Sequence, residues 1–334
     1  MRTEDRLPYR VPAPAADAII RWPADFGTRF LVFVDVEEEF DWSAPLDASH
    51  RSVRAMRAFP AAHAWFAERG IGLACMVDHP VASDPVAVAI LRDAMTDGRS
   101  TIGAQLHAWV TPPFAAAQPG DSYAGNLPRA LEAAKLDALI ERLTQAFGTS
   151  PRAYRAGRYG IGPNTAELLV ERGFRVETSM RAHYDYRADG GPDFTTIDSR
   201  AHRLGSLIEL PLTSVFAGRL RGAGPALFPL LGRVPHARGA FARSGLLQRI
   251  ALTPEDMPID DALLAVRIAV RERHDRLLTF AFHSPSLEPG HTPYVRNRDD
   301  LARFWLWWAR MIDFLRDLNV RPTTVGEVIA AAEA

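Results

Sequence analysis

The stretch FLVFVDVEEEF, residues 30–40, joins a short apolar strand to four carboxylates at its carboxyl end. Residues 31–34 lack the polar alternation of a half-exposed strand, so this strand is predicted to be buried on both faces. Acids crowded beyond a strand repel one another and raise each other's pKa unless a cation, an arginine or a proton compensates. The stretch therefore indicates a metal or acid/base site. The alternative is an acidic loop exposed to solvent.

Composition sets the class of protein. The chain has 334 residues, 47% of them hydrophobic and 24% charged, which is typical of a globular protein with a large core. Its net charge of −1 offers no electrostatic basis for binding nucleic acid or an anionic membrane, so neither is expected as a partner. The charged, proline-broken N-terminus has no apolar stretch of the length of a signal peptide or membrane span, and a cytoplasmic protein is expected.

The order of apolar and polar segments predicts an α/β fold in one domain. Residues 1–27 are rich in Pro and Ala and are expected to form an N-terminal arm. From residue 28 to residue 334, short strands alternate with amphipathic helices in about seven βα units, which favours a (β/α) barrel. An open doubly wound sheet is the alternative, but no Gly-rich phosphate loop follows the first strand. Residues 216–258 break the alternation and are expected to form an irregular excursion covering the barrel. Strands are expected at residues 30–34, 71–77, 100–104, 153–155, 175–178, 207–210 and 277–282. Helices are expected at residues 52–68, 86–95, 127–147, 163–172, 259–274, 301–318 and 325–332.

Three later segments carry further polar groups at strand ends. In TIGAQLHAWVTPPF, residues 101–114, the side chains of Gln105, His107 and Trp109 alternate along an extended segment. Alternate residues of an extended chain point to one side, so these three groups are expected to face one cavity.

The segment YRAGRYG, residues 154–160, places Arg155, Arg158 and Tyr159 after a middle strand. Arg158 and Tyr159 are candidates for substrate binding, and bracing the loop after Arg155 is the equally weighted alternative.

The fourth segment, FAFHSPSLEPGHTPY at residues 280–294, ends a buried strand with a histidine. His283 lies at the strand end, and Glu288 and His291 follow on a stiff loop rich in Pro and Gly. His291 is a further candidate for substrate binding.

Together the four segments resemble the NodB-homology polysaccharide deacetylases over residues 30–330. The resemblance implies a distorted seven-stranded (β/α) barrel and a metal-assisted site that removes acyl groups from N-acylated sugars. By this resemblance Asp35 matches the general base and Glu37 an acidic metal ligand. Arg155 matches the arginine that orients the catalytic aspartate, and His283 matches the general acid.

One motif departs from the family pattern. The family's second motif uses two histidines four residues apart as metal ligands, and this chain has Gln105 and Trp109 at those positions. His107 lies on the same face and is expected to replace one ligand, whereas the neutral oxygen of Gln105 suits hard cations better than zinc. Glu288, His291 and the pair at residues 78–79 are candidates to complete the site. The segment ELPLT at residues 209–213 and the loop after His283 look closest to a bacterial subgroup labelled WalW-like.

Two functions from different classes remain. The first is a metal-assisted hydrolase of a non-peptide amide bond, acting on an N-acylated sugar or related small amide with zinc or another transition metal held by Glu37 and His107. The second is a catalytically inactive carbohydrate-binding or regulatory protein on a deacetylase barrel, with Trp109 stacking on a sugar ring. Other (β/α) barrel hydrolases are not separated by fold alone.

Overall fold

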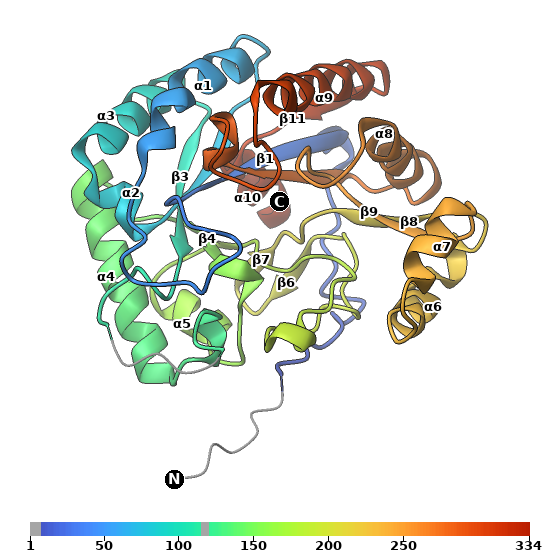
Figure 1. Cartoon of the computed structure of the whole chain (residues 1–334), viewed down its shortest axis with the longest axis horizontal. Coiled ribbons are helices and arrows are strands. Elements are labelled where there is room, and N and C mark those ends of the chain that lie inside the picture. Colours follow the sequence, from blue (N-terminus) through green and yellow to red (C-terminus); the bar gives the residue numbers. More distant parts are fainter. Residues whose placement is uncertain (1–7, 115–119) are drawn as a thin grey trace.

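The computed structural model describes residues 8–114 and 120–334, and its centre is a curled, mostly parallel sheet with helices on the outside (Figure 1). Within the described residues the strands follow the order β10-β1-β2-β3-β4-β5-β7-β6, and β11 pairs with β1. The strands of this sheet are β1 (Thr28–Val36), β2 (Leu73–Val77), β3 (Thr101–Leu106), β4 (Ala153–Ala156), β5 (Val176–Glu177), β6 (His202–Leu204), β7 (Leu207–Glu209), β10 (Leu277–His283) and β11 (Val320–Pro322). The prediction of an α/β fold with a (β/α) barrel is confirmed, because the seven strands from β10 to β7 along this path all run parallel.

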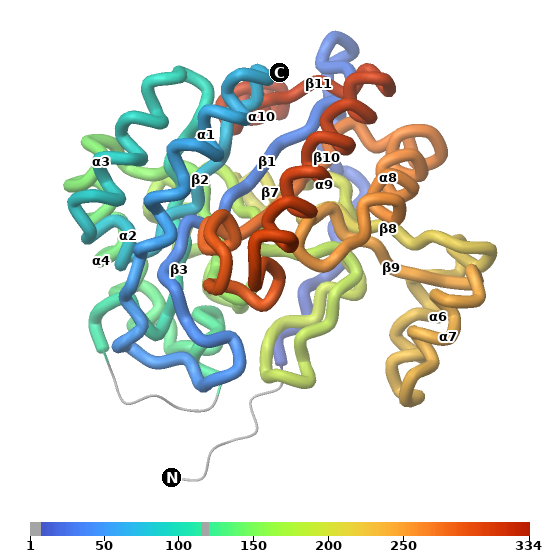
Figure 2. The backbone as a smooth tube through the Cα atoms, turned by 45° about the horizontal axis from the view of Figure 1, so that its top comes forward, coloured from blue at the N-terminus to red at the C-terminus, as the bar shows by residue number. Residues whose placement is uncertain are grey.

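Most of the helices lie around the outside of the curled sheet, as the two views of the backbone show (Figures 1 and 2). Their bounds are α1 (Phe59–Ala67), α2 (His79–Ser83), α3 (Pro85–Ala94), α4 (Arg129–Phe147), α5 (Thr165–Glu171), α6 (Gly224–Leu231), α7 (Ala237–Arg243), α8 (Ile259–Arg267), α9 (Arg298–Asp317) and α10 (Val325–Glu333). The aromatic face of α9 packs against the barrel: the ring of Trp308, fully buried, lies 5.1 Å from Phe66 and 5.8 Å from Phe280 between centroids. No helix of the described residues is long and apolar enough to cross a membrane.

Strand β1 is buried on both faces, as its continuous apolar run predicts. It pairs with β10 along one edge and with β11 and then β2 along the other. This register places Asp35 directly beside His283, and the pairing of β3 with β4 places Gln105 directly beside Arg155. The parallel register therefore assembles four of the expected site residues at one edge of the sheet.

The two ends of the curled sheet meet through side chains as well as backbone. The backbone N–H of Thr213 donates to the hydroxyl of Thr279 at 2.8 Å, and the N–H of Thr279 donates to the hydroxyl of Thr213 at 2.9 Å. Leu252 lies beside both, because its N–H donates to Thr213 and its carbonyl accepts from Ala281. These contacts form a seam, residues Thr213, Leu252, Thr279 and Ala281, that closes the barrel on one side.

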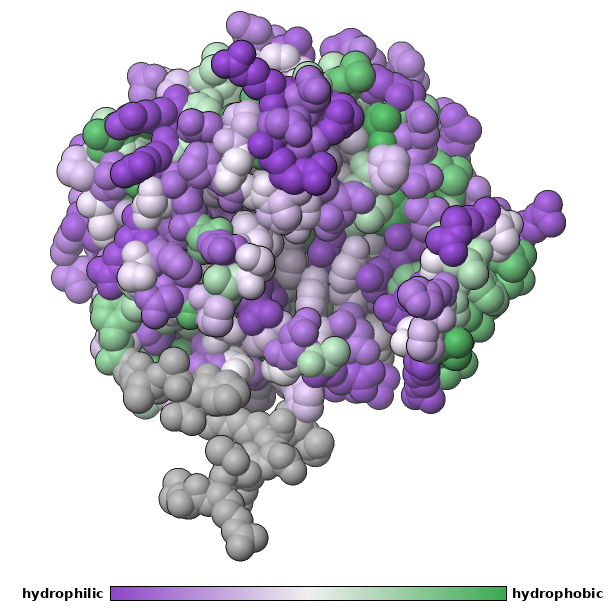
Figure 3. Space-filling model, in the orientation of Figure 1, coloured by the Kyte–Doolittle hydropathy of each residue, from purple (hydrophilic) through white to green (hydrophobic). Residues whose placement is uncertain are grey.

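The segment at residues 216–258, expected to be an irregular excursion, contains regular structure. Strands β8 (Ser214–Ala217) and β9 (Gln248–Ala251) form an antiparallel pair, and α6 and α7 lie between them. Figure 1 shows these two helices projecting from the side of the barrel, and Figure 3 shows hydrophobic side chains on that side of the molecule. Leu230 and Val234 are 51% and 58% exposed there. The sequence lacks a clear period in this stretch because its helices are short and broken by Gly and Pro.

Candidate functional site

A cavity of about 710 Å³ lies where β1, β3, β4 and β10 end. Acids, histidines, arginines and aromatic rings share its wall with apolar residues of the seam. Its polar and aromatic lining includes Asp35, Glu37, Trp42, Gln105, His107, Trp109, Arg158, Tyr159, Arg181, Glu255, Asp256, His283 and Tyr294. Concave sites of this volume with a few converging polar groups are typical of small-molecule binding.

Asp35 lies between two cationic groups at the floor of the cavity. Its Oδ1 accepts a hydrogen bond from Nη1 of Arg155, and its Oδ2 lies 3.6 Å from Nε2 of His283. Arg155 is itself fully buried and fixed, because its Nε donates to the carbonyl of Thr178 at 3.1 Å and its guanidinium lies 4.8 Å from the ring centre of Phe33. One oxygen of Asp35 is therefore held by the arginine, and the other faces the histidine.

His283 is oriented by a second acid, Glu255. The ring Nδ1 of His283 lies 2.7 Å from Oε2 of Glu255, and the backbone N–H of His283 donates to the other oxygen of Glu255 at 3.0 Å. Burial acts to lower the pKa of His283, but the charges of Glu255, Glu37 and Asp35 raise it to about 10. His283 is therefore protonated at neutral pH, with Nε2 directed at Asp35.

Glu37 lies beside Gln105 and His107, and part of this group lacks partners. Oε2 of Glu37 accepts from the amide of Gln105 at 3.2 Å and lies 3.4 Å from Nε2 of His107. Oε1 of Glu37 and Oε1 of Gln105 are buried without a hydrogen-bond partner among the described residues. Burial raises the pKa of Glu37 above its ordinary value. Two buried oxygens without donors indicate that this corner of the cavity is built to receive a positive or hydrogen-donating group.

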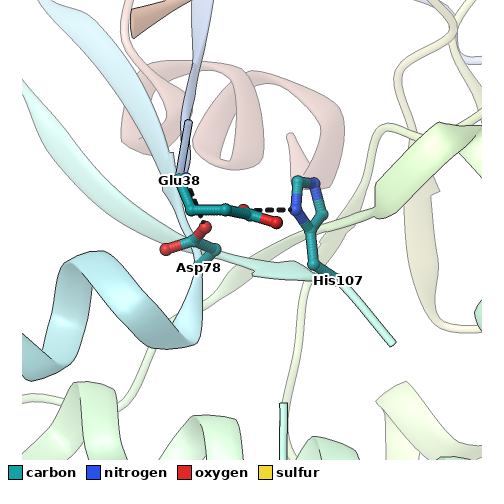
Figure 4. Close-up of side chains that lie close together, drawn as sticks. All are labelled: Glu38, Asp78 and His107. Atoms are coloured by element: carbon teal, nitrogen blue, oxygen red, sulfur yellow. Dashed lines mark hydrogen bonds and ion pairs between the residues drawn. The ribbon is translucent and has the colours of Figure 1, made fainter. Parts of the chain in front are cut away.

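Glu38 lies with Asp78 and His107 in a group that is closed by its own hydrogen bonds (Figure 4). Its Oε2 lies 2.7 Å from Nδ1 of His107, and its Oε1 accepts from the indole N–H of Trp109 at 2.7 Å. Asp78 accepts from the backbone N–H groups of Glu38 and Val81 at 2.7 and 2.8 Å. Every carboxylate oxygen of Glu38 and Asp78 thus already has a donor.

The charges in this closed group follow from the contacts. Burial acts to raise the pKa of Glu38, but the charge of His107 and the hydrogen bonds to Asp78 and His107 lower it to about 2. Burial and the neighbouring Glu38 raise the pKa of Asp78 well above its ordinary value. Burial acts to lower the pKa of His107, yet the charges and hydrogen bonds of Glu38 and Glu37 raise it well above 6.5. The carboxylates of Glu37 and Glu38 on either side of His107 therefore both favour positive charge at this position.

Two groups that include His107 are candidates to hold a cation. Among the described residues, ligand atoms of Glu38, Asp78 and His107 lie within 4.8 Å of one another, but the two acids are saturated with hydrogen bonds and do not line the cavity. Glu37, Gln105 and His107 line the cavity and include the two unpartnered oxygens. The second set fits a divalent cation better. In it, Glu38 would orient His107 from behind, as carboxylates commonly do for metal-ligating histidines.

Glycine is required behind His107. A Cβ atom at Gly157 would lie 2.4 Å from Cδ2 of His107. The next two residues, Arg158 and Tyr159, have φ angles of 55° and 61°, which is unusual for residues with side chains. Strained backbone of this kind persists where the surroundings fix it, and it concentrates at functional sites.

The remaining predicted site residues lie in different places. Arg158 lines the cavity, donates to the hydroxyl of Ser122 at 2.6 Å and stacks on Tyr123 at 4.2 Å. Trp109 lines the cavity too, but its ring stacks on His107 with centroids 4.3 Å apart. His291 lies outside the cavity lining, with Nδ1 3.5 Å from Oε2 of Glu39.

Glu255 and Arg181 line the cavity but were not predicted from the sequence. Glu255 lies in TPED, two acids after strand β9 and before a helix, a pattern that would have been a weak signal. Trp42 and Tyr294 flank His283, with ring centroids 5.3 and 6.3 Å away. Arg181 also lines the cavity and follows no motif.

Comparison with known proteins places the fold. No family model matches the sequence, and no curated protein matches it. Among solved structures, a protein assigned as a polysaccharide deacetylase from Mycobacterium smegmatis is 18% identical with a TM-score of 0.50, covering 93% of this chain and 97% of its own. PuuE allantoinase is 14% identical with a TM-score of 0.52, covering 99% of this chain and 97% of its own. At these identities the likeness is one of fold, and the chain shares the polysaccharide deacetylase type of (β/α) barrel.

Proposed function

We propose that this protein hydrolyses the acyl amide bond of an N-acylated sugar or a related small amide. The observation that carries the proposal is the position of Asp35, held by Arg155 on one oxygen and facing His283 with the other, in the wall of a cavity. Amide hydrolysis needs a base for water, an acid for the leaving amine and a positive centre for the oxyanion. The cavity offers residues for the first two tasks and donor atoms that could hold a cation for the third.

The base and the acid are Asp35 and His283. Arg155 fixes the carboxylate of Asp35 and leaves Oδ2 free to take a proton from water. His283, with its pKa raised to about 10 although burial acts to lower it, carries a proton that it can give to the leaving amine. Glu255 holds Nδ1 of the ring, so the proton on Nε2 is the one directed into the cavity.

The positive centre would lie beside Glu37. A divalent cation held by Glu37 and His107, with the carbonyl oxygen of Gln105, would supply Lewis acidity for the carbonyl and lower the pKa of a bound water. The two unpartnered oxygens of Glu37 and Gln105 support this assignment. An oxygen-rich set suits a harder cation such as Mn²⁺ better than Zn²⁺.

A second candidate function has its own supporting observation. Trp109 and Gln105 stand where the deacetylase resemblance expects histidines, and Trp109 is bound to Glu38 within the closed group. A protein that binds acylated carbohydrate without turnover fits this arrangement. Trp42 and Tyr294 would then offer aromatic faces to a sugar beside His283.

Acetate release from a panel of N-acetylated mono- and oligosaccharides, measured with and without added Mn²⁺ or Zn²⁺, separates the two. If the protein is a hydrolase, it should release acetate, and Asp35→Asn should lower the rate by about 10²–10⁴-fold. The matched control Asp313→Asn, which removes a surface acid paired with Arg316, keeps full turnover. Metal analysis after dialysis should return one ion for each chain. Absence of acetate release together with ligand-induced thermal stabilisation would favour the binding protein.

A further inference from the structure

We infer that Arg181 binds an anionic group of the substrate, so that the ligands of this cavity are acidic amides carrying a carboxylate or a phosphate rather than neutral ones. The inference rests on the proposed function in one respect: Arg181 lines the same cavity as Asp35 and His283. It concerns recognition, and it names the class of molecule that the site selects.

Arg181 is fixed in place by neutral partners. Its backbone forms a parallel bridge to Leu212, which lies beside the seam. Its guanidinium carbon lies 3.9 Å from the ring centre of Tyr184 and 5.5 Å from that of Tyr159, and its Nη1 is 3.4 Å from the hydroxyl of Tyr186. The stacked guanidinium is thus oriented in advance of any ligand.

No carboxylate pairs with this guanidinium. Within residues 8–114 and 120–334, the structure records no ion pair of Arg181, although Asp256 shares the cavity wall with it. The contrast with Arg155 is plain, since Arg155 is bonded to Asp35. A cation in a partly desolvated wall is costly without an opposite charge, and the aromatic faces compensate only in part.

A second arginine increases the excess of positive charge. Arg249, on strand β9, lies 3.3 Å from the same ring centre of Tyr184 and donates to the carbonyl of His183 at 2.6 Å. Its Nε is buried and has no hydrogen-bond partner among the described residues. Two guanidinium groups thus contact one tyrosine, with no acid bonded to either in the described part of the chain, and Arg181 is the one that lines the cavity, where an anion could pair with it.

The position of Arg181 suits a small bifunctional ligand. Tyr159, which contacts Arg181, follows Arg155 by four residues at the end of β4, and Asp256 follows Glu255, the partner of His283. The guanidinium and the Asp35 centre therefore belong to neighbouring parts of one cavity. Arginine offers paired N–H donors that match carboxylate and phosphate oxygens, which makes it well suited to select such groups.

The test measures binding without turnover. Isothermal titration of the full-length Asp35→Asn protein would compare N-acetylmuramic acid and N-acetylglucosamine 6-phosphate with neutral N-acetylglucosamine. Both acids should bind roughly 10–100-fold more tightly than the neutral sugar, and this preference should shrink as salt is raised. The two acids distinguish a carboxylate from a phosphate preference.

In the Asp35→Asn protein, the further substitution Arg181→Gln should abolish the preference for the acids. Arg181→Lys should keep part of the preference, which would show that the protein still folds when Arg181 is replaced. The matched control Arg69→Gln removes an arginine that stacks on Trp65 at the same distance of 3.9 Å, and it should leave the preference intact. Equal binding of acidic and neutral sugars, absence of binding by either acid, or a preference that survives Arg181→Gln would overturn the inference. Acid-selective binding in a wild-type protein that releases no acetate would reject the proposed hydrolysis and retain this inference.

Discussion

Asp35 and Glu38 lie three residues apart at the end of β1, yet they are held in opposite ways. Asp35 has one oxygen on Arg155 and the other open to the cavity and to His283. Glu38 has both oxygens occupied, by His107 and Trp109, and does not line the cavity. The same acidic run therefore has two roles. On the reactive side Asp35 faces the cavity, and on the other side Glu38 belongs to a scaffold that positions His107.

The largest expected effect concerns the ion pair on the reactive side. Arg155→Gln leaves Asp35 buried without its partner, so the free energy of unfolding should fall by about 3–5 kcal/mol. In the double variant with Asp35→Asn the loss should be much smaller, because no uncompensated charge remains. Chemical denaturation measures both, and Arg310→Gln, which breaks a surface pair with Asp260, is the control. Additive losses in the double variant would show that the two groups do not depend on each other.

The second prediction separates ligand from support on the two sides of His107. Glu37→Gln should weaken binding of Mn²⁺ by more than about 100-fold, because it removes a ligand. Glu38→Gln should weaken it by about 10–100-fold, the usual cost of losing the group that orients a ligating histidine. Calorimetric titration with Mn²⁺ gives both numbers, with Glu68→Gln as an exposed control. Equal loss in the two variants would mean that Glu38 itself binds the metal.

The third prediction concerns the acid on the reactive side. The pKa of His283 is raised to about 10, against the effect of burial, so its proton is present below that pH and is lost as pH rises through it. Glu255→Gln removes the largest favourable charge, and the pKa should fall by about one unit or more. The alkaline limb of kcat/KM should move toward neutrality by the same amount. Histidine NMR titration would follow His283 directly, with the buried His202 as an unchanged reference. A limb that stays in place would remove His283 from the role of acid.

The smallest expected effect tests the scaffold alone. Trp109→Phe keeps an aromatic ring against His107 but removes the indole N–H that donates to Glu38. Thermal unfolding should show a loss of about 1–3 kcal/mol, typical of a hydrogen bond to a charged group. Affinity for N-acetylated sugars should change little, because an aromatic face remains. A large loss of sugar affinity with unchanged stability would instead make Trp109 a direct sugar contact.

Much of the fold could be predicted because its signals are local. The apolar run of β1 and the alternation of strands with helices indicate the barrel, and strand ends indicate where polar groups gather. That Asp35 and His283 lie at strand ends could be predicted, whereas their direct pairing follows from the register of β1 and β10 in the structure. The helices α6 and α7 were missed, because short helices interrupted by Gly and Pro leave no period to detect.

The roles of several site residues could not be predicted, because they depend on partners that are distant in the sequence. That Glu38 binds His107 and Trp109 depends on how β3 continues into its loop, 69 and 71 residues later. That Glu255 holds His283 depends on the return of the chain after β9. Arg181 lies in no recognisable sequence motif. What distinguishes it is that no acidic side chain pairs with it among the described residues.

The seam between Thr213 and Thr279 joins the wall of the cavity by hydrogen bonds that break more easily than those between neighbouring strands. Elsewhere the barrel strands are joined by backbone ladders, whereas here the backbone N–H groups of Thr213 and Thr279 are bonded to hydroxyls that a side-chain rotation can turn away. Thr213, Leu252 and Ala281 of this seam also line the cavity. We expect the amide of Thr279 to exchange with solvent deuterium faster than the amides of β1. Room for a bulkier acyl chain would then come from the barrel parting along this line, with the Asp35 floor left undisturbed.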